Sequence, residues 1–243
     1  MGIIGIIGAM ASEVELLTEQ MEDKAVLRLA GIDFHYGLLE KRPAVVAQCG
    51  IGKVYAAMCA QAMIDKFHVE ALINTGVAGG LHPALHIGDL VIGTDAVQHD
   101  FDLTSFGHAK GYMAGEETDK PTRYLSDSTL ITAFKAAADE VLDGHQYLEG
   151  TIASGDIFVA DEALKRELRD RFQAAAAEME GAAIAQAATA NAVPFVVVRA
   201  ISDLAGEEAS MSFTEFEKEA AKTSARIVLG MLRRLAAGEE EPA

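Results

Sequence analysis

The chain has 243 residues, of which 50% are hydrophobic, and its 37 acidic and 20 basic residues give a formal net charge of −17. A chain of this length can bury a large core, so we expect one domain spanning residues 1–243. The acidic excess disfavours nucleic acid and anionic membranes as partners, which leaves a small neutral or cationic ligand.

The N-terminal run "MGIIGIIGAMA" predicts a buried first strand. It is too short to span a bilayer and lacks the positively charged start of a signal peptide. Its glycines are spaced GxxGxxG, whereas a dinucleotide-binding turn has the spacing GxGxxG. Cys49 and Cys59 cannot form a disulfide framework, so we expect two inert thiols and a cytoplasmic location.

Runs of apolar and β-branched residues predict strands at 3–8, 44–50, 71–76, 89–97 and 194–202. Helical patterns begin at Ser12, Lys53 and Ser128, and a final helix of about twenty residues begins at Ser212. The stretch 25–48 predicts an antiparallel hairpin, and residues 236–243 are expected to be a disordered tail. This alternation indicates an α/β fold with helices on both faces of the sheet.

Ligands of such sheets bind beyond the carboxyl ends of the strands, so the polar residues that follow each strand are the candidates. They lie at 10–13, 51–52, 75–80, 99–102, 154–156, 178–180 and 202–203. No HxxxH, HExxH or paired-cysteine pattern occurs, so we expect no metal. The segment from His99 to Asp102 comes nearest, but a hydrogen-bonded loop histidine is favoured there. Ser154 lacks the GxSxG context of a hydrolase nucleophile.

The remaining candidates are carboxylates. Glu13 opens a predicted helix and Asp203 follows a predicted strand, so a first-turn acid and a turn or N-cap residue are the structural alternatives. Glu178 and Glu180 are harder to explain, because they flank a predicted strand-to-helix turn inside the apolar run "AAAAEMEGAAIAQAA". Acids gathered at one sheet edge suit protonation of a leaving group and activation of water, as in glycoside cleavage.

Eight motifs in order carry a resemblance to a known family: "GIIGAMASEV", "GIGKV", "NTGVAGGL", "HDFDLTSFG", "ASGDIFV", "AEMEGAAIA", "VPFVVVRAISD" and "MSFTEF". Together they resemble the bacterial 5'-methylthioadenosine/S-adenosylhomocysteine nucleosidases of the nucleoside phosphorylase superfamily, from Ile3 to about Leu235. The resemblance implies a three-layer α/β/α fold with a central mixed sheet. It also implies hydrolysis of an adenine N-glycosidic bond without metal or organic cofactor.

The resemblance also implies roles for single residues. Glu13 would take a proton from the attacking water, Asp203 would protonate adenine at N7, and Glu180 would bind the ribose hydroxyls. Glu178 matches a family glutamate, for which we favour a structural role in the turn. The other substrate-binding residues implied are Met10, Ile51, Gly79, Phe158, Val159, Met179, Arg199, Ser202 and Phe213.

Within that set, Phe158 would stack on adenine while the backbone of Val159 reads its edge, and Arg199 would position the water or Glu13. Leu103 and Phe106 would complete the site of a neighbouring subunit, which implies a homodimer. The chain departs from the family pattern in two places. Val77 stands where some members have serine, and Ala114 stands where a proline often occurs.

Two other functions stay open at this point. A purine nucleoside phosphorylase has the same fold, but it needs cationic groups around phosphate, and Glu13 with the neutral "NTGVAGG" offers none. A non-catalytic nucleoside-binding protein is disfavoured because all three acids are retained. Methylthioadenosine, S-adenosylhomocysteine, 5'-deoxyadenosine and aminofutalosine share the adenosine part, so the sequence does not rank them as substrates.

Overall fold

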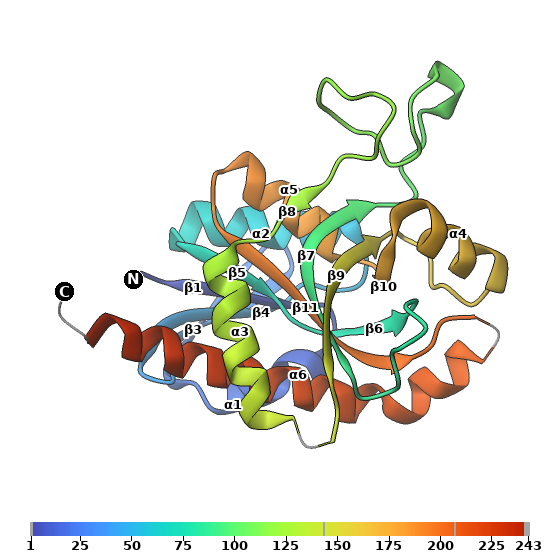
Figure 1. Ribbon diagram of the computed structural model, residues 1–243. Coiled ribbons are helices and arrows are strands. Elements are labelled where there is room, and N and C mark those ends of the chain that lie inside the picture. Colours follow the sequence, from blue (N-terminus) through green and yellow to red (C-terminus); the bar gives the residue numbers. More distant parts are fainter. Residues whose placement is uncertain (1, 143, 207, 241–243) are drawn as a thin grey trace.

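A computed structural model describes residues 2–142, 144–206 and 208–240, with side chains described up to residue 235. Among these residues, eleven strands form one mixed sheet in the order β2-β3-β4-β1-β5-β11-β6-β10-β9-β7-β8 (Figure 1). The strands are β1 (Ile4–Gly8), β2 (Glu22–Leu29), β3 (Ile32–Leu39), β4 (Arg42–Gln48), β5 (Ala71–Asn74), β6 (Val77–Gly80), β7 (Leu90–Gln98), β8 (Tyr124–Leu125), β9 (Tyr147–Ser154), β10 (Ala174–Glu178) and β11 (Phe195–Asp203).

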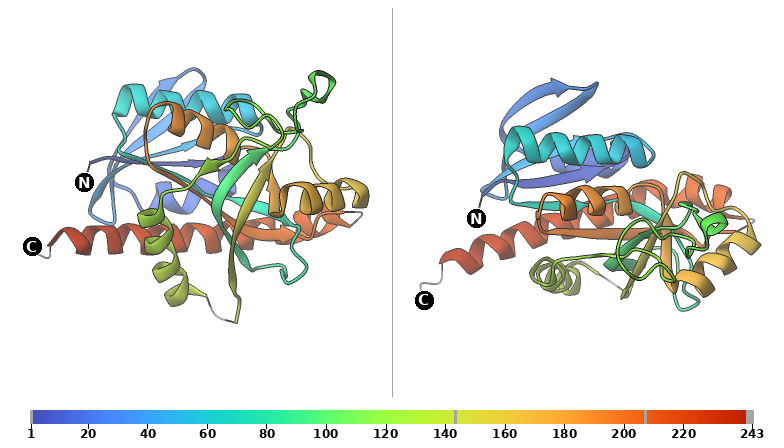
Figure 2. Two further views of the ribbon diagram at one scale, coloured as in Figure 1. Left: turned by 45° about the horizontal axis from the view of Figure 1, so that its top comes forward. Right: turned by 90° about the horizontal axis from the view of Figure 1, so that it is seen from above.

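Helices cover both faces of the sheet, as Figure 2 shows from two further directions. The helices α2 (Lys53–Phe67) and α5 (Gly181–Ala190) lie on one face, and α1 (Ala11–Glu19), α3 (Ser128–Val141) and α6 (Ala209–Glu240) lie on the other. The helix α4 (Glu162–Phe172) packs near β9 and β10, and a short 3-10 helix η1 spans Thr104–Phe106. The prediction of an α/β/α arrangement with a mixed sheet is therefore confirmed.

The central strands are apolar throughout because both of their faces are covered. All residues of β1 and β11 are buried, whereas most residues of the edge strand β2 are exposed. The strand β11 pairs with β5 through its first residues, with β7 through Val198–Ala200, and with β6 through its last residues. Because β11 pairs with both β6 and β7, the strands β11, β6, β10, β9 and β7 form a closed ring of paired strands.

Several predicted elements are present, and others differ. The stretch 25–48 forms an antiparallel meander of β2, β3 and β4, and β4 then pairs in parallel with β1. The last helix has 32 residues, against the shorter helix expected from Ser212. Sequence analysis missed α4, whose sequence EALKRELRDRF is so charged that only Leu168 and Phe172 are buried.

The expected tail falls partly outside the described residues. The backbone of α6 is helical through Glu240, whereas disorder was expected from residue 236, and residues 241–243 lie outside the described part. None of the described helices combines the length and apolar character that a bilayer span requires. For the site, the important feature is that residues following β1, β9, β10 and β11 line one cavity, although β9 and β10 run antiparallel to β11 in the sheet.

Candidate active site

A cavity of about 360 Å³ lies where these strands end. Its lining includes most of the residues predicted for the site, and these are Met10, Glu13, Ile51, Gly79, Phe158, Met179, Glu180, Ser202, Asp203 and Phe213. A wider hollow lies between α1 and the β2–β3 hairpin, but Arg28 and Asp33, an exposed ion pair, contribute to its wall. The smaller cavity is the candidate site because buried carboxylates line it.

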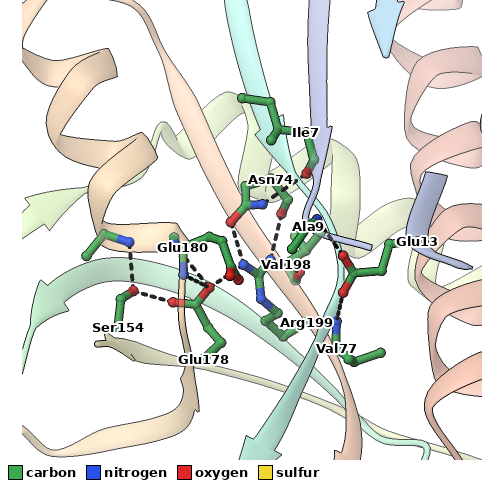
Figure 3. Close-up of polar contacts among 12 residues, drawn as sticks. Ile7, Ala9, Glu13, Asn74, Val77, Ser154, Glu178, Glu180, Val198 and Arg199 are labelled. Carbon is green, nitrogen blue, oxygen red and sulfur yellow. Dashed lines mark hydrogen bonds and ion pairs between the residues drawn. The ribbon is translucent and has the colours of Figure 1, made fainter. Parts of the chain in front are cut away.

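Glu13 is held in place by backbone donors from two elements (Figure 3). Its Oε2 accepts from Ala9 N at 2.6 Å and Met10 N at 2.9 Å, and its Oε1 accepts from Val77 N at 3.0 Å. The side chain is 4% exposed, and this burial raises its pKa, although nearby Arg199 and the backbone donors oppose the shift. Glu13 is thus both a first-turn acid of α1 and a fixed carboxylate facing the cavity.

Glu178 and Glu180 have different surroundings, although only Met179 separates them. Glu178 forms a buried ion pair with Arg199 and accepts hydrogen bonds from Ser154 Oγ, Glu180 N at 3.1 Å and Gly181 N at 2.8 Å. It therefore fixes the turn between β10 and α5, which supports the structural role favoured for it.

Glu180 accepts a hydrogen bond from Gly52 N at 2.8 Å, and the described residues supply no other donor to its carboxylate. Burial and the adjacent charge of Glu178 raise its pKa, against the opposing effect of Arg199. Its second oxygen is free for donors that a ligand would bring, such as sugar hydroxyls. Glu180 stands in an apolar run because it lines the cavity, where its second carboxylate oxygen can accept a hydrogen bond from a ligand.

Asp203 ends β11, and its two oxygens accept hydrogen bonds from Ala205 N at 2.8 Å and Ser202 Oγ at 3.0 Å. The side chain is buried, and this raises its pKa, while both hydrogen bonds lower it. Because α6 begins only at Ala209, Asp203 is not the N-cap of that helix. Its carboxyl group is fixed in direction and lines the cavity.

The glycines of "TGVAGG" make room for these acids. A Cβ at Gly79 would lie 2.9 Å from Asp203 Oδ1, and a Cβ at Gly76 would collide with the Glu13 carboxylate. These glycines are therefore needed by the carboxylates themselves, whatever ligand occupies the cavity.

Aromatic and aliphatic side chains form the rest of the wall. Phe158 and Phe213 meet edge to face, with ring centroids 5.7 Å apart. Val159 lines a small hollow next to the cavity together with Gly79, Phe158 and Asp203, and its carbonyl oxygen accepts from Gly206 N at 3.1 Å. Ile51 is 57% exposed at the cavity, so this side is open in the single chain.

Besides Val159, three predicted residues lie away from the cavity lining. Arg199 donates hydrogen bonds to Glu178 and Asn74, and it affects Glu13 through its charge. Leu103 directly precedes η1 and Phe106 is its last residue, in the segment between β7 and β8, which projects from the body of the protein (Figure 1). Phe106 is 78% exposed.

Two polar residues of the site were missed or discounted. Asn74 donates to Ile7 O at 2.9 Å and receives a hydrogen bond from Arg199, so it joins β1, β5 and β11 behind the cavity. Ser154 bonds Glu178 and accepts from Ala182 N at 2.7 Å. Both residues end a strand, and that position was the signal that could have identified them.

Metal binding finds no support in the described part of the chain, where no group of three or more His, Cys, Asp or Glu side chains could hold an ion. His99, the nearest candidate, is buried, and its Nε2 has no hydrogen-bond partner there. Burial lowers the pKa of His99, which keeps the ring neutral. Within the described residues His99 hydrogen-bonds through its backbone N to Ser154 O at 3.0 Å and through neither ring nitrogen, so the hydrogen-bonded imidazole favoured at this position is not observed.

The cavity can protonate one side of a ligand and accept a proton on another. Glu13, Glu180 and Asp203 face it, and none of its described lining residues is Lys, Arg or His. Such a site favours a neutral ligand that becomes cationic during reaction, and it disfavours an anion.

The chain is similar to known proteins over almost its whole length. The family model described as Phosphorylase superfamily matches residues 3–233. A 5'-methylthioadenosine/S-adenosylhomocysteine nucleosidase of Geobacillus thermodenitrificans is 46% identical over 228 residues, which cover 93% of this chain and 94% of the relative. A nucleosidase of the same name from Colwellia psychrerythraea, solved in complex with adenine, is similar with a TM-score of 0.91, 39% identity and 96% of both chains covered. A futalosine hydrolase of Helicobacter pylori has a TM-score of 0.89 and 37% identity, with 96% of this chain and 98% of that chain covered.

The raised pKa of Glu180 predicts a cost in stability. A carboxyl whose pKa is higher folded than unfolded destabilises the protein progressively as the pH rises above the unfolded pKa of about 4.3. The cost is complete above the folded pKa of about 8, and it vanishes below the unfolded pKa. We expect Glu180→Gln to raise the melting temperature at pH 8 by about 2–4 °C, the shift that roughly 1 kcal/mol produces in a domain of this size. The gain should disappear as the pH approaches about 4.

Calorimetry at several pH values measures this effect. Glu15→Gln makes the same chemical change on the exposed face of α1 and should leave the melting temperature within about 1 °C. A Glu180→Gln variant that is no more stable than the unchanged protein at pH 8 contradicts the prediction.

Proposed function

The chain belongs to the 5'-methylthioadenosine/S-adenosylhomocysteine nucleosidases of the phosphorylase superfamily, and from this membership and the cavity we infer that it is an N-glycosyl hydrolase that releases adenine. Its substrates are 5'-methylthioadenosine, S-adenosylhomocysteine and related 5'-substituted adenosines. The observation that carries the mechanism is the set of buried carboxylates around an apolar cavity whose described lining has no cationic side chain.

Each carboxylate has a separate role in this proposal. Adenine leaves poorly as an anion, so Asp203 donates a proton toward N7, and its fixed hydrogen bonds to Ser202 and Ala205 aim the carboxyl group. The C–N bond breaks as the ribose becomes oxocarbenium-like, and water attacks C1' from the opposite face while Glu13 takes its proton. Glu180 binds the ribose hydroxyls, and its negative charge favours the cationic transition state.

The apolar residues position the two ends of the substrate. Phe158 stacks on adenine, the backbone of Val159 with Gly79 borders the base, and Met10, Ile51, Met179 and Phe213 surround the ribose and the 5' group. Arg199 serves this site from behind by holding Glu178 and by moderating the charge on Glu13. Aminofutalosine is a second candidate substrate, because a futalosine hydrolase shares the fold over nearly the whole chain.

We also propose that the protein is a single cytoplasmic domain. The family model covers residues 3–233 without interruption. Cys49 and Cys59 are free and buried, and burial raises both thiol pKa values, that of Cys59 to about 12. Two protonated, inaccessible thiols are consistent with a reducing compartment and with no role in the chemistry.

A homodimer with shared sites is proposed from the open side of the cavity. Ile51 at the cavity, Val54 and Tyr55 at the start of α2, and Phe106 on the projecting segment are all more than half exposed in the single chain. The segment that contains Leu103 and Phe106 projects from the body of the protein, and neither residue lines the cavity of its own chain, which supports a role for it at the site of a second copy. A partner would cover these apolar side chains and close the wall around the 5' group.

Adenine release should be independent of phosphate, since a phosphate beside Glu13 would meet a carboxylate and no cationic side chain of the described lining. Exhaustively dialysed enzyme is incubated with 5'-methylthioadenosine, with and without phosphate, and the products are separated by chromatography. We expect equal rates and a free 5-methylthioribose product. Release of adenine only with phosphate, together with a ribose 1-phosphate product, would identify a phosphorylase. No release under either condition would favour a binding protein.

Asp203→Asn should lower kcat by about 10² to 10⁴, the range typical of general-acid catalysis, because the amide keeps the shape but has no acidic proton. The melting temperature and the binding of a neutral adenosine analogue should change little. The matched control is Asp127→Asn, at the N-cap of α3, where the carboxylate accepts from Thr129 N and Leu130 N away from the cavity. It should keep full kcat. Preserved turnover in a folded Asp203→Asn variant excludes Asp203 as the acid.

Phe106→Asp should convert the proposed dimer to a monomer and lower kcat/KM, because a carboxylate cannot be buried in the apolar wall of a partner site. Light scattering at assay concentration measures the mass, and kinetics are measured on the same sample. Val26→Asp places the same charge on the exposed side of β2 and should affect neither. A fully active monomer of the unchanged chain contradicts the shared site.

A further inference from the structure

Three polar residues outside the proposed chemistry form a closed ring of hydrogen bonds. Lys53 N donates to Asp156 Oδ1 at 2.8 Å, Asp156 N donates to Asp100 Oδ2 at 2.9 Å, and Lys53 Nζ donates to Asp100 Oδ1 at 2.6 Å. The ring joins the N-terminus of α2, the segment after β7 and the segment after β9. These segments are far apart in the sequence, so the ring fixes three loops relative to one another.

Each of these loops carries a group of the proposed site. Gly52, directly before Lys53, donates through its backbone N to Glu180 at 2.8 Å. Phe158 comes two residues after Asp156, and Leu103 comes three residues after Asp100. The ring therefore lies behind the ribose-binding carboxylate, the adenine-stacking ring and the start of the segment proposed to reach the partner.

Gly52 and the start of α2 are in close contact with Asp156. Its φ of 103° lies in the left-handed region, and a Cβ there would come 3.1 Å from Asp156 Oδ1. Gly52 is the N-cap of α2 and has no side chain to cap the helix, so the cap on Lys53 N comes from Asp156 in another loop. A shift of Asp156 would thus move the first turn of α2 and the N–H that holds Glu180.

Two members of the ring are largely buried, whereas the third, Asp156, is exposed. The side chains of Lys53 and Asp100 are 17% and 18% exposed. Burial opposes the charge on Asp100, but hydrogen bonds from Lys53 and Asp156 outweigh it and lower its pKa, so it stays ionised at neutral pH. Lys53 also donates to Gln98 at 3.0 Å, and Gln98 donates to Gln186 of α5 at 2.7 Å.

We propose that Lys53, Asp100 and Asp156 are positioning residues that hold the Gly52 amide against Glu180 and so orient this carboxylate for the ribose hydroxyls. The inference rests on the proposed function of Glu180. Its test must separate orientation of one carboxylate from general support of the fold, because removing any partly buried charge partner can lower stability.

Asp100→Ala removes the acceptor for both Lys53 and Asp156, and Lys53→Met removes only the ammonium group while keeping the backbone donor. We expect each variant to lower kcat/KM for 5'-methylthioadenosine by about tenfold. This loss is smaller than the roughly 10²-fold loss that a 1 Å misplacement of a catalytic group can cause. Hydrogen exchange at the amides of Gly52 and Lys53 should become faster. The matched control is Asp95→Ala on β7, which breaks an ion pair of the same 2.6 Å length, with Arg123, at a carboxylate 13% exposed. It should leave both measurements unchanged.

The decisive comparison uses Glu180→Gln, which we expect to lower kcat/KM by about 10² by loss of a transition-state contact. If the ring acts through Glu180, adding Asp100→Ala to Glu180→Gln should lower kcat/KM less than twofold further. A full tenfold further loss, or an Asp100→Ala variant that matches Asp95→Ala in kinetics and exchange, overturns the proposal. Should Asp100→Ala fail to fold, Lys53→Met gives the same comparison. Failure of the proposed function appears separately, as no adenine release by the unchanged enzyme, and exchange at Gly52 then decides for or against the ring.

Discussion

The buried ion pair between Arg199 and Glu178 is the interaction on which the site depends (Figure 3). Both side chains are 2% exposed, and the guanidinium also donates to Asn74 O at 3.2 Å and Val198 O at 2.9 Å. These bonds tie β5, β10 and β11 together with one cation. A lone buried charge would be very costly, but here each partner satisfies the other and the remaining donors find carbonyl groups.

The same arginine makes the other acids possible. Its charge opposes the rise in pKa that burial causes at Glu13 and Glu180. The acid that it contacts directly is Glu178. Among its described lining residues the cavity thus has carboxylates but no cationic side chain, and the positive charge of Arg199 lies behind this lining. This separation is the physical reason that the site suits a substrate that becomes positively charged, and that an anionic nucleophile such as phosphate is disfavoured.

The acids are fixed by backbone groups more than by other side chains. Glu13 has three N–H donors, Asp203 has Ala205 N, and Glu180 has Gly52 N. Backbone donors at strand ends and helix starts cannot rotate away, so the carboxylates hold their direction without a ligand. Glu180 is the exception, because Gly52 N is its only donor among the described residues, whereas Asp203 also accepts a hydrogen bond from Ser202 Oγ. The ring of Lys53, Asp100 and Asp156 matters for that reason.

Much of this protein was determined by local sequence. The apolar runs of β1 and β11 predict covered central strands, and the turn around Glu178 and Glu180 follows from an alanine-rich strand that meets an alanine-rich helix. The candidate acids follow from their positions after strands or at the start of a helix, where ligands of α/β sheets bind. The particular roles came from resemblance to a family, since two glutamates one residue apart look alike in sequence.

Only the tertiary structure decided which partner each charge has. The sequence did not indicate that the Arg199 guanidinium would donate to Glu178, Asn74 and Val198, which lie close together only after β5, β10 and β11 have paired. The helix α4 was not predicted because its charged sequence buries few residues. The ring of Lys53, Asp100 and Asp156 was not predicted because it joins loops that are dozens of residues apart in the sequence. The periodicity of apolar residues indicates which face of a segment packs against the core. Hydrogen-bond and ion-pair partners depend instead on distances between segments, which exist only in the folded chain.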